Sequence, residues 1–382
     1  MTNYGFITVA AAVPRTKVAD VQHNIEEIER LIVMAEKNNV ELLIFPELCI
    51  TGYSCQDLFR SSSLLDASDD ALRLLTDFSL GRGITFVVGA PLRQDDRLMN
   101  TAVVISNGQR HYIHKTFLPN YNEFYEKRWF SVEALDAEPR IFRLPTGVTF
   151  GVELGSDLWS VMPPSTILAT SGADIILNLS ASNELAGKHK YLLSLLSQQS
   201  SRTMSGYVYS SCGFGESTQD LVYGGDAIIY ENGTLLSQSE RFSLEPQLVI
   251  AQIDVERLRN ERRTNTTFGR AQGTLMAKAE VVELELDDNA YSMLQRGFTL
   301  KRQYDPMPFV PKAEDMDETC EEIFNIQVMA LVKRMMHTNC KNVVLGISGG
   351  LDSTLALLVC VRTFDKIGFD RKGIHGITMP GF

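Results

Sequence analysis

The sequence predicts an α/β protein with more than one domain. The opening residues alternate strand, helix and strand, because the apolar runs 5–12 and 41–45 flank 17–37, where apolar residues recur at the spacing of one helix face. Near the other end, the apolar run 343–347 meets a glycine turn and then a helix-like stretch from Ser353. A chain of 382 residues is also long for one domain, so two or three are expected.

Composition and charge exclude several classes of function. The hydrophobic fraction of 44% is ordinary for a globular protein, and no run of about 18 apolar residues predicts a membrane span. A net charge of -11 argues against a nucleic-acid partner, which would need a basic face. The six cysteines are scattered without a Cys-x-x-Cys pair, and the start of the chain lacks the regions of a signal peptide. We therefore expect a cytoplasmic protein with reduced thiols and no membrane partner.

The first half continues as strands and hairpins. Apolar runs at 84–90 and 101–106 predict two strands, and the Asn-Gly dipeptide at 107–108 predicts a type I′ turn before the return strand 109–114. A second Asn-Gly dipeptide at 232–233 predicts another hairpin.

A boundary between domains is predicted well after the middle of the chain. A closing strand is expected at 248–253, a charged helix at 254–263 and a connector at 264–270. Three of the thirteen prolines fall within 304–311, and an acidic run follows. We therefore predict a first domain at 1–270, a linker at 271–317 and a second domain at 318–382, which opens with an amphipathic helix.

The strand, glycine loop and helix start within 343–359 predict an anion site, because free N–H groups and the positive end of the helix dipole converge there. A glycine turn without a ligand is the plainer alternative. The order Ser-Gly-Gly-Leu-Asp-Ser resembles the signature of the ATP pyrophosphatases, which cleave ATP to AMP and pyrophosphate. The resemblance implies that Asp352 helps to place the phosphates or Mg²⁺. It assigns the pyrophosphate to Ser348, Gly349, Gly350, Ser353 and Thr354.

Glu47 ends the second predicted strand, where a partly desolvated carboxylate can act as a general base. Alone, a Glu at a strand end is more often a solvated loop residue. However, Phe-Pro-Glu-Leu-Cys-Ile-Thr-Gly-Tyr at 45–53 resembles the block that carries the catalytic Glu of the nitrilase family of amide-cleaving enzymes. That resemblance implies a four-layer α-β-β-α sandwich, and it makes Lys115 the buried lysine that stabilises an oxyanion.

The same resemblance implies further site residues. The supporting glutamate lies eight residues after the lysine in that family, which is Glu123 here. The amide pocket is expected to include Tyr121, Trp159 and Ser182.

The family's nucleophile has no counterpart in this chain. The block around 151–159 resembles Gly-Val-Glu-Ile-Cys-Glu-Asp-Leu-Trp, but the cysteine falls on Gly155 and the next glutamate on Ser156. Glycine has no side chain to attack, and a serine hydroxyl one position off is a weaker nucleophile than an activated thiol. Cys212 is more simply a small buried thiol than a substitute. We therefore expect no glutamine hydrolysis through a thioester, whether the glycine is natural or introduced.

A nitrilase-like half followed by this signature resembles glutamine-dependent NAD⁺ synthetases. The resemblance implies that ATP with Mg²⁺ adenylates nicotinic acid adenine dinucleotide, and that ammonia from glutamine reaches it through a tunnel and displaces AMP. It also implies a homo-oligomer and a doubly wound parallel α/β synthetase domain, of which 318–382 would be only the start, so this chain alone should lack synthetase activity.

Three other functions fit parts of the sequence. A stand-alone nitrilase-type amidase fits the first half, but Gly155 and the glycine loop count against it. A catalytically silent, nitrilase-like binding module agrees with the missing nucleophile. A different ATP-pyrophosphatase amidotransferase agrees with the loop but less well with the first half.

Overall fold

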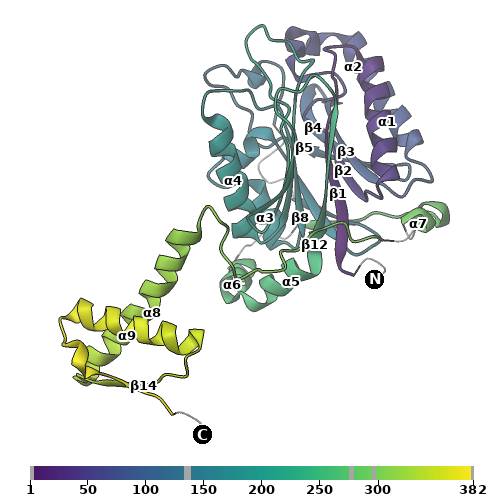
Figure 1. Cartoon of the computed structure of the whole chain (residues 1–382). Helices are drawn as coiled ribbons and strands as arrows, with labels where there is room; N and C mark the ends of the chain where they lie inside the picture. The colour runs from purple at the N-terminus through teal and green to yellow at the C-terminus, as the bar shows by residue number, and fades with distance from the viewer. Residues whose placement is uncertain (1–3, 133–138, 275–278, 295–297, 380–382) are drawn as a thin grey trace. The chain divides into compact units, whose positions relative to one another are not determined.

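The structure is a computed structural model that describes residues 4–132, 139–274, 279–294 and 298–379. The chain forms two compact units, residues 1–302 and 303–382 (Figure 1).

The first unit contains two β-sheets packed face to face. The six-stranded sheet has the order β12 (Gln247–Asp254), β1 (Phe6–Val13), β2 (Leu42–Ile44), β3 (Thr85–Gln94), β4 (Arg97–Ser106) and β5 (Gln109–His114). The seven-stranded sheet has the order β11 (Thr234–Gln238), β10 (Ala227–Glu231), β9 (Gly206–Ser211), β8 (Ile175–Ser180), β7 (Thr149–Leu154), β6 (Arg140–Arg143) and β13 (Glu280–Glu283).

Helices cover the outer face of each sheet. The helices of this unit are α1 (Val21–Lys37), α2 (Ser62–Phe78), α3 (Pro164–Thr170), α4 (Lys188–Thr203), α5 (Val255–Thr264), α6 (Thr266–Thr274) and α7 (Asp288–Leu294). Three short 3₁₀ turns are η1 (Tyr53–Arg60), η2 (Glu126–Arg128) and η3 (Gly155–Trp159). Apolar side chains of α1 and α2 pack on the six-stranded sheet, and those of α3 and α4 pack on the other.

A third apolar cluster fills the space between the sheets, which completes four layers, α-β-β-α. Alternate residues of β1 show why: Val9 faces the middle cluster, whereas Ala10 faces the helices, as the period of two in a strand requires. The predicted fold class of this unit is therefore confirmed.

Both predicted hairpins are present. Asn107 and Gly108 have φ of 41° and 78°, and Asn232 and Gly233 have φ of 44° and 82°. Positive φ at both central residues is what a type I′ turn requires, and it explains the Asn-Gly sequences.

The first unit extends past the predicted limit of residue 270. The expected connector 264–270 lies largely in α6, and part of the expected linker forms β13, which pairs in parallel with β6 at the sheet edge. The Gln252 side chain also donates to the Thr299 carbonyl and accepts from the Lys301 N–H. The strand pairing and these hydrogen bonds attach part of the predicted linker to the sandwich. The sequence did not predict this attachment, because the segment is polar.

The second unit is smaller. It contains α8 (Met316–Thr338), β14 (Val343–Gly346), α9 (Leu351–Ile367), the 3₁₀ turn η4 (Arg371–Gly373) and β15 (Ile374–Ile377). Strands β14 and β15 pair in parallel, with α9 as the connection between them, as expected for the start of a parallel α/β sheet. None of the helices within the described ranges is both long and apolar enough to cross a membrane.

Candidate active site

Three predicted site residues meet at one end of the sandwich. Glu47 follows β2, Lys115 follows β5 and Gly155 follows β7, so all three lie just beyond strand ends. The Lys115 ammonium lies 2.6 Å from Glu47 Oε1, and their side chains are only 2% and 1% exposed. A buried ion pair this short places the predicted base and the predicted oxyanion donor in direct contact.

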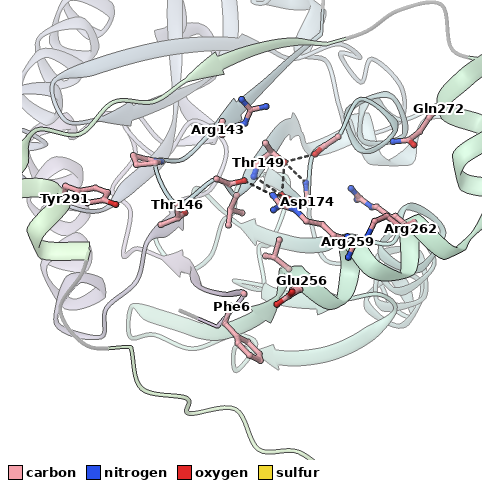
Figure 2. A pocket seen from close by; sticks show the side chains of 17 residues that line it. Phe6, Arg143, Thr146, Thr149, Asp174, Glu256, Arg259, Arg262, Gln272 and Tyr291 are labelled. Carbon is pink, nitrogen blue, oxygen red and sulfur yellow. Dashed lines mark hydrogen bonds and ion pairs between the residues drawn. The ribbon is translucent and has the colours of Figure 1, made fainter. Parts of the chain in front are cut away.

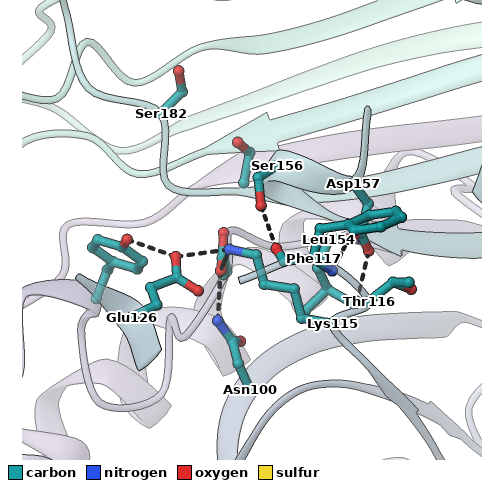
Figure 3. A network of polar contacts seen from close by, with 12 residues as sticks. Asn100, Lys115, Thr116, Phe117, Glu126, Leu154, Ser156, Asp157 and Ser182 are labelled. Atoms are coloured by element: carbon teal, nitrogen blue, oxygen red, sulfur yellow. Dashed lines mark hydrogen bonds and ion pairs between the residues drawn. The ribbon is translucent and has the colours of Figure 1, made fainter. Parts of the chain in front are cut away.

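A second carboxylate, Glu126, completes the cluster. Lys115 Nζ donates to Glu126 Oε1 at 2.8 Å, and the Tyr53 hydroxyl donates to the same oxygen at 2.7 Å (Figure 3). Spacing alone assigns the supporting role to Glu123, whose Oε1 instead accepts from Asn183 Nδ2 at 2.7 Å. The glutamate that contacts the lysine is therefore Glu126, and the run 121–130 contains both.

Burial and charge set the protonation of this cluster. Burial lowers the pKa of Lys115, but the charges of Glu126 and Glu47 outweigh burial and raise that pKa above its ordinary value. Burial, assisted by the charge of Glu47, raises the pKa of Glu126 to about 7 against the opposing effect of Lys115. Lys115 therefore stays charged at neutral pH, while Glu126 keeps its proton to a higher pH than an ordinary glutamate does.

Asn100 orients the predicted base. Its side-chain Nδ2 donates to Glu47 Oε1 at 2.6 Å, so the same oxygen receives Lys115 and Asn100. The other oxygen of this carboxylate, Glu47 Oε2, is directed at residue 155.

Gly155 occupies the position expected of the nucleophile. Its φ is +44°, and it begins the turn η3. A Cβ built on Gly155 would lie 2.5 Å from Glu47 Oε2 and 3.3 Å from Lys115 Nζ. The backbone thus brings residue 155 to the base and the ammonium, and Glu47 fills the space that a side chain would take.

The turn after β7 is held by Asp157, which the sequence reasoning did not select. Its carboxylate accepts the N–H groups of Phe117 at 2.7 Å and of Leu154 at 3.1 Å, which joins the segment after β5 to the elbow. Burial raises the pKa of Asp157 to about 7. The sequence feature that could have pointed to Asp157 is an acidic residue three positions after the end of a predicted buried strand.

Two other candidate nucleophiles are not activated for attack. The Ser156 hydroxyl donates to the Phe117 carbonyl at 2.6 Å (Figure 3), so its proton is directed away from Glu47. Cys212 is buried, and burial raises the pKa of its thiol well above the ordinary value. Cys212 therefore lacks the low-pKa, exposed environment of a reactive cysteine.

A cavity of about 210 Å³ opens beside the cluster. The three residues predicted to form the pocket, Tyr121, Trp159 and Ser182, all line it. The predicted catalytic residues line it as well: Glu47, Lys115, Glu123 and Gly155. Lys188, at the start of α4, also lines it and lies 5.6 Å from the Trp159 ring centre. The sequence analysis did not select Lys188. The one sequence feature that could have pointed to it is its position at the start of a predicted helix, directly after Gly187.

The glycine loop lies in the second unit. Gly350 is the N-cap of α9, and Gly349 has φ of +82°, which favours glycine. Thr354 Oγ1 donates to the Gly350 carbonyl at 2.9 Å, and the hydroxyls of Ser348 and Ser353 are 3.2 Å apart. The first N–H groups of a 17-residue helix are therefore available to a phosphate.

Asp352 is the carboxylate of this loop, in the first turn of α9. Within the described ranges, no group of three or more His, Cys, Asp or Glu side chains is placed to hold a metal ion. The residues fit a magnesium ion only when phosphate oxygens supply most of its ligands, which is the usual arrangement for nucleotide-bound Mg²⁺.

Comparison with known protein families gives two matches. Residues 8–263 match the carbon-nitrogen hydrolase family, and residues 323–382 match NAD synthase. The first match covers both the Glu47–Lys115 cluster and Gly155, whereas the second covers the glycine loop.

Individual relatives carry both parts. The chain is 36% identical to the glutamine-dependent NAD(+) synthetase of Mycobacterium tuberculosis over 99% of its own length, and 34% identical to that of Mycobacterium leprae. It spans 58% of the length of each of these relatives.

Solved structures share the fold. A glutamine-dependent NAD+ synthetase from Acinetobacter baumannii, in complex with ADP, has a TM-score of 0.60 at 23% identity and covers 98% of this chain and 60% of its own. An amidase, NitN, has a TM-score of 0.57 at 21% identity and covers 67% of this chain and 97% of its own.

Proposed function

Because the chain belongs to the carbon-nitrogen hydrolase family, we propose that its first unit is the glutamine-binding part of a glutamine-dependent NAD⁺ synthetase, with the thioester nucleophile absent. One observation carries this proposal: Gly155 lies against Glu47 and Lys115, where an attacking side chain would stand. The match of residues 323–382 to NAD synthase supports the second half of the assignment.

The first unit retains the means to bind an amide. An ammonium group has three donors, and Lys115 uses two of them on Glu47 and Glu126. The third donor is available to the carbonyl oxygen of a glutamine side chain in the cavity. Tyr121, Trp159 and Ser182 are the proposed walls of that pocket. Since no side chain at 155 attacks the carbonyl carbon, the amide is held without forming an acyl-enzyme.

The second unit is proposed to hold the phosphates of ATP. The N–H groups at the start of α9 and the hydroxyls of Ser348, Ser353 and Thr354 provide donors for the pyrophosphate that leaves on adenylation. Asp352 would share Mg²⁺ with the phosphate oxygens, and the ion would neutralise part of their charge. The acceptor is nicotinic acid adenine dinucleotide, and free ammonia replaces glutamine as the nitrogen donor. We further propose that the protein is a cytoplasmic homo-oligomer.

Intact-mass measurement tests the missing nucleophile. The chain incubated with glutamine should show no added mass, whereas Gly155→Cys should acquire a glutamyl adduct when trapped by acid. Calorimetry should detect glutamine binding to the unchanged chain. An adduct on the unchanged chain would refute the proposal for the first unit.

A catalytically silent binding module is the second candidate, and the intact Glu47–Lys115–Glu126 cluster around a glycine favours it. An assay of NAD⁺ formation from nicotinic acid adenine dinucleotide, with ammonia and ATP, separates the two. Product formation that Ser353→Ala reduces supports the synthetase, and glutamine binding without any product supports the silent module.

A further inference from the structure

Figure 2 shows a second cavity of the first unit, whose volume is about 800 Å³. Thr149, at the start of β7, and Asp174, just before β8, both line it. Gly155 follows the far end of β7, and a six-residue strand rises about 3.3 Å per residue, so the two sites are roughly 20 Å apart. This cavity is therefore separate from the amide site.

The cavity is rich in positive charge, although the chain as a whole carries -11. Among the residues that the structure describes, two carboxylates line it, those of Asp174 and Glu256. Against them stand four guanidinium groups, from Arg143, Arg259, Arg262 and Arg263. An excess of arginine in a concave site on an acidic protein is a local preference for anions.

Within the described part of the chain, ion pairs account for two of these arginines. Asp174 accepts from Arg259 Nε at 2.9 Å and Nη2 at 2.6 Å, and it also accepts the Thr149 N–H at 2.9 Å. Arg143 pairs with Glu283. Arg263 is exposed and has no ion-pair partner among the described residues.

Arg262 is only partly satisfied, because two of its three nitrogens have hydrogen-bond partners and no carboxylate contacts it among the described residues. Its Nε and Nη2 donate to the carbonyls of Met204, Ala173 and Thr203 at 3.0, 2.8 and 3.0 Å, and its guanidinium lies 5.1 Å from the Phe268 ring centre. Within the described ranges its Nη1 bonds to nothing, and its group contacts no carboxylate. Burial lowers the pKa of Arg262 to about 10, so it stays charged at neutral pH. The charge of Asp174 opposes this effect, but that carboxylate is bonded to Arg259, so the cavity is where a counter-charge in direct contact with Arg262 would fit.

Other lining residues indicate more than a simple ion. Thr146 Oγ1 is buried without a hydrogen-bond partner in the described part of the chain. Tyr291 lies across the pocket from Arg262 and adds an aromatic face (Figure 2). The volume also falls in the range of small-molecule sites and far exceeds that of an inorganic anion.

We propose that this cavity binds a phosphate-bearing small molecule of mononucleotide size. Its phosphate would accept from Nη1 of Arg262 and from the guanidinium of Arg263, whose planar fork suits phosphate oxygens. Its ring would pack near Tyr291. This assignment rests on the first unit alone and does not depend on the activity proposed above.

Calorimetric titration of the 382-residue chain with AMP, in buffer free of phosphate, tests the site. Saturable binding is expected, and Arg263→Gln should weaken it about tenfold, which is the usual effect of losing one charged hydrogen bond. Arg257→Gln is the matched control, because Arg257 lies on the same helix, pairs with Glu261 and does not line the cavity. It should leave the affinity unchanged.

Two further measurements complete the test. The first shows whether AMP binds in this cavity or at the glycine loop, and the second shows whether the phosphate or the nucleoside is recognised. Ser353→Ala alters the glycine loop, so AMP binding that falls with this variant and not with Arg263→Gln would overturn the proposal. Adenosine should bind at least about tenfold more weakly than AMP. Equal binding of adenosine, or no saturable AMP binding, would also overturn it.

Discussion

Replacing Gly155 with alanine tests whether Glu47 fills the space of the missing side chain. An alanine Cβ would lie 2.5 Å from Glu47 Oε2, closer than real contacts, so the carboxylate must move. Glu47 Oε1 is held at 2.6 Å by both Lys115 and Asn100, and movement weakens at least one of these bonds. Loss of a charged hydrogen bond costs about 1.5–3 kcal/mol.

Backbone conformation adds a second cost. Residue 155 has φ of +44°, and a left-handed conformation costs a residue with a Cβ about 1–2 kcal/mol. Together the two effects should lower the free energy of unfolding by about 2.5–5 kcal/mol. Urea unfolding followed by tryptophan fluorescence measures this in the first unit, since both tryptophans, Trp129 and Trp159, belong to it.

Gly147→Ala is the control for the backbone alone. Gly147 has φ of +81°, but a Cβ there meets nothing within 4 Å among the described atoms, so only the conformational cost of about 1–2 kcal/mol is expected. If Gly155→Ala costs no more than Gly147→Ala, Glu47 does not occupy the space beside residue 155, and the argument for a filled site fails.

The charged groups and the glycine loop lead to three more expected outcomes. Burial raises the pKa of Glu126 and of Asp157 to about 7, above their unfolded values of 4.5 and 3.8. The stability that these two groups contribute is therefore complete below the unfolded pKa values and is lost as the pH rises through about 7. The urea midpoint should fall between about pH 4 and about pH 7, and Glu126→Gln should make this fall smaller. Lys115→Met leaves two buried carboxylates without their partner and should lower the free energy of unfolding by about 3–5 kcal/mol at pH 8, and by less at pH 5, as urea titrations at both values will show. Ser353→Ala should weaken ATP binding in calorimetry by roughly threefold to tenfold, the effect of one neutral hydrogen bond, while an unchanged affinity would argue against the loop as a phosphate site.

The sequence predicted those features that depend on local pattern. Strand and helix periods placed Glu47 and Lys115 at strand ends, and Asn-Gly turns marked both hairpins. Features that depend on packing were missed. Glu126 and Glu123 are three residues apart in one irregular loop, and only the path of that loop decides which carboxylate reaches Lys115. The arginine-lined cavity could not be foreseen either, because strand β6 and helix α5 bring its four guanidinium groups together from distant parts of the sequence.

The crowding beside residue 155 also limits what a Gly155→Cys variant can recover. Its Cβ requires the same shift of Glu47 as alanine does, so this shift should cost the cysteine variant the same stability. However, Sγ lies one bond farther out, and a displaced Glu47 Oε2 would then be placed to accept the thiol proton. Lys115 stands 3.3 Å from the built Cβ and favours the thiolate. In the cysteine variant, the hydrogen bond between the thiol and Glu47 would therefore offset part of the stability that the alanine variant loses. A cysteine variant that is more stable than the alanine variant and also forms the glutamyl adduct would support this view, and one that is equally unstable and unreactive would contradict it.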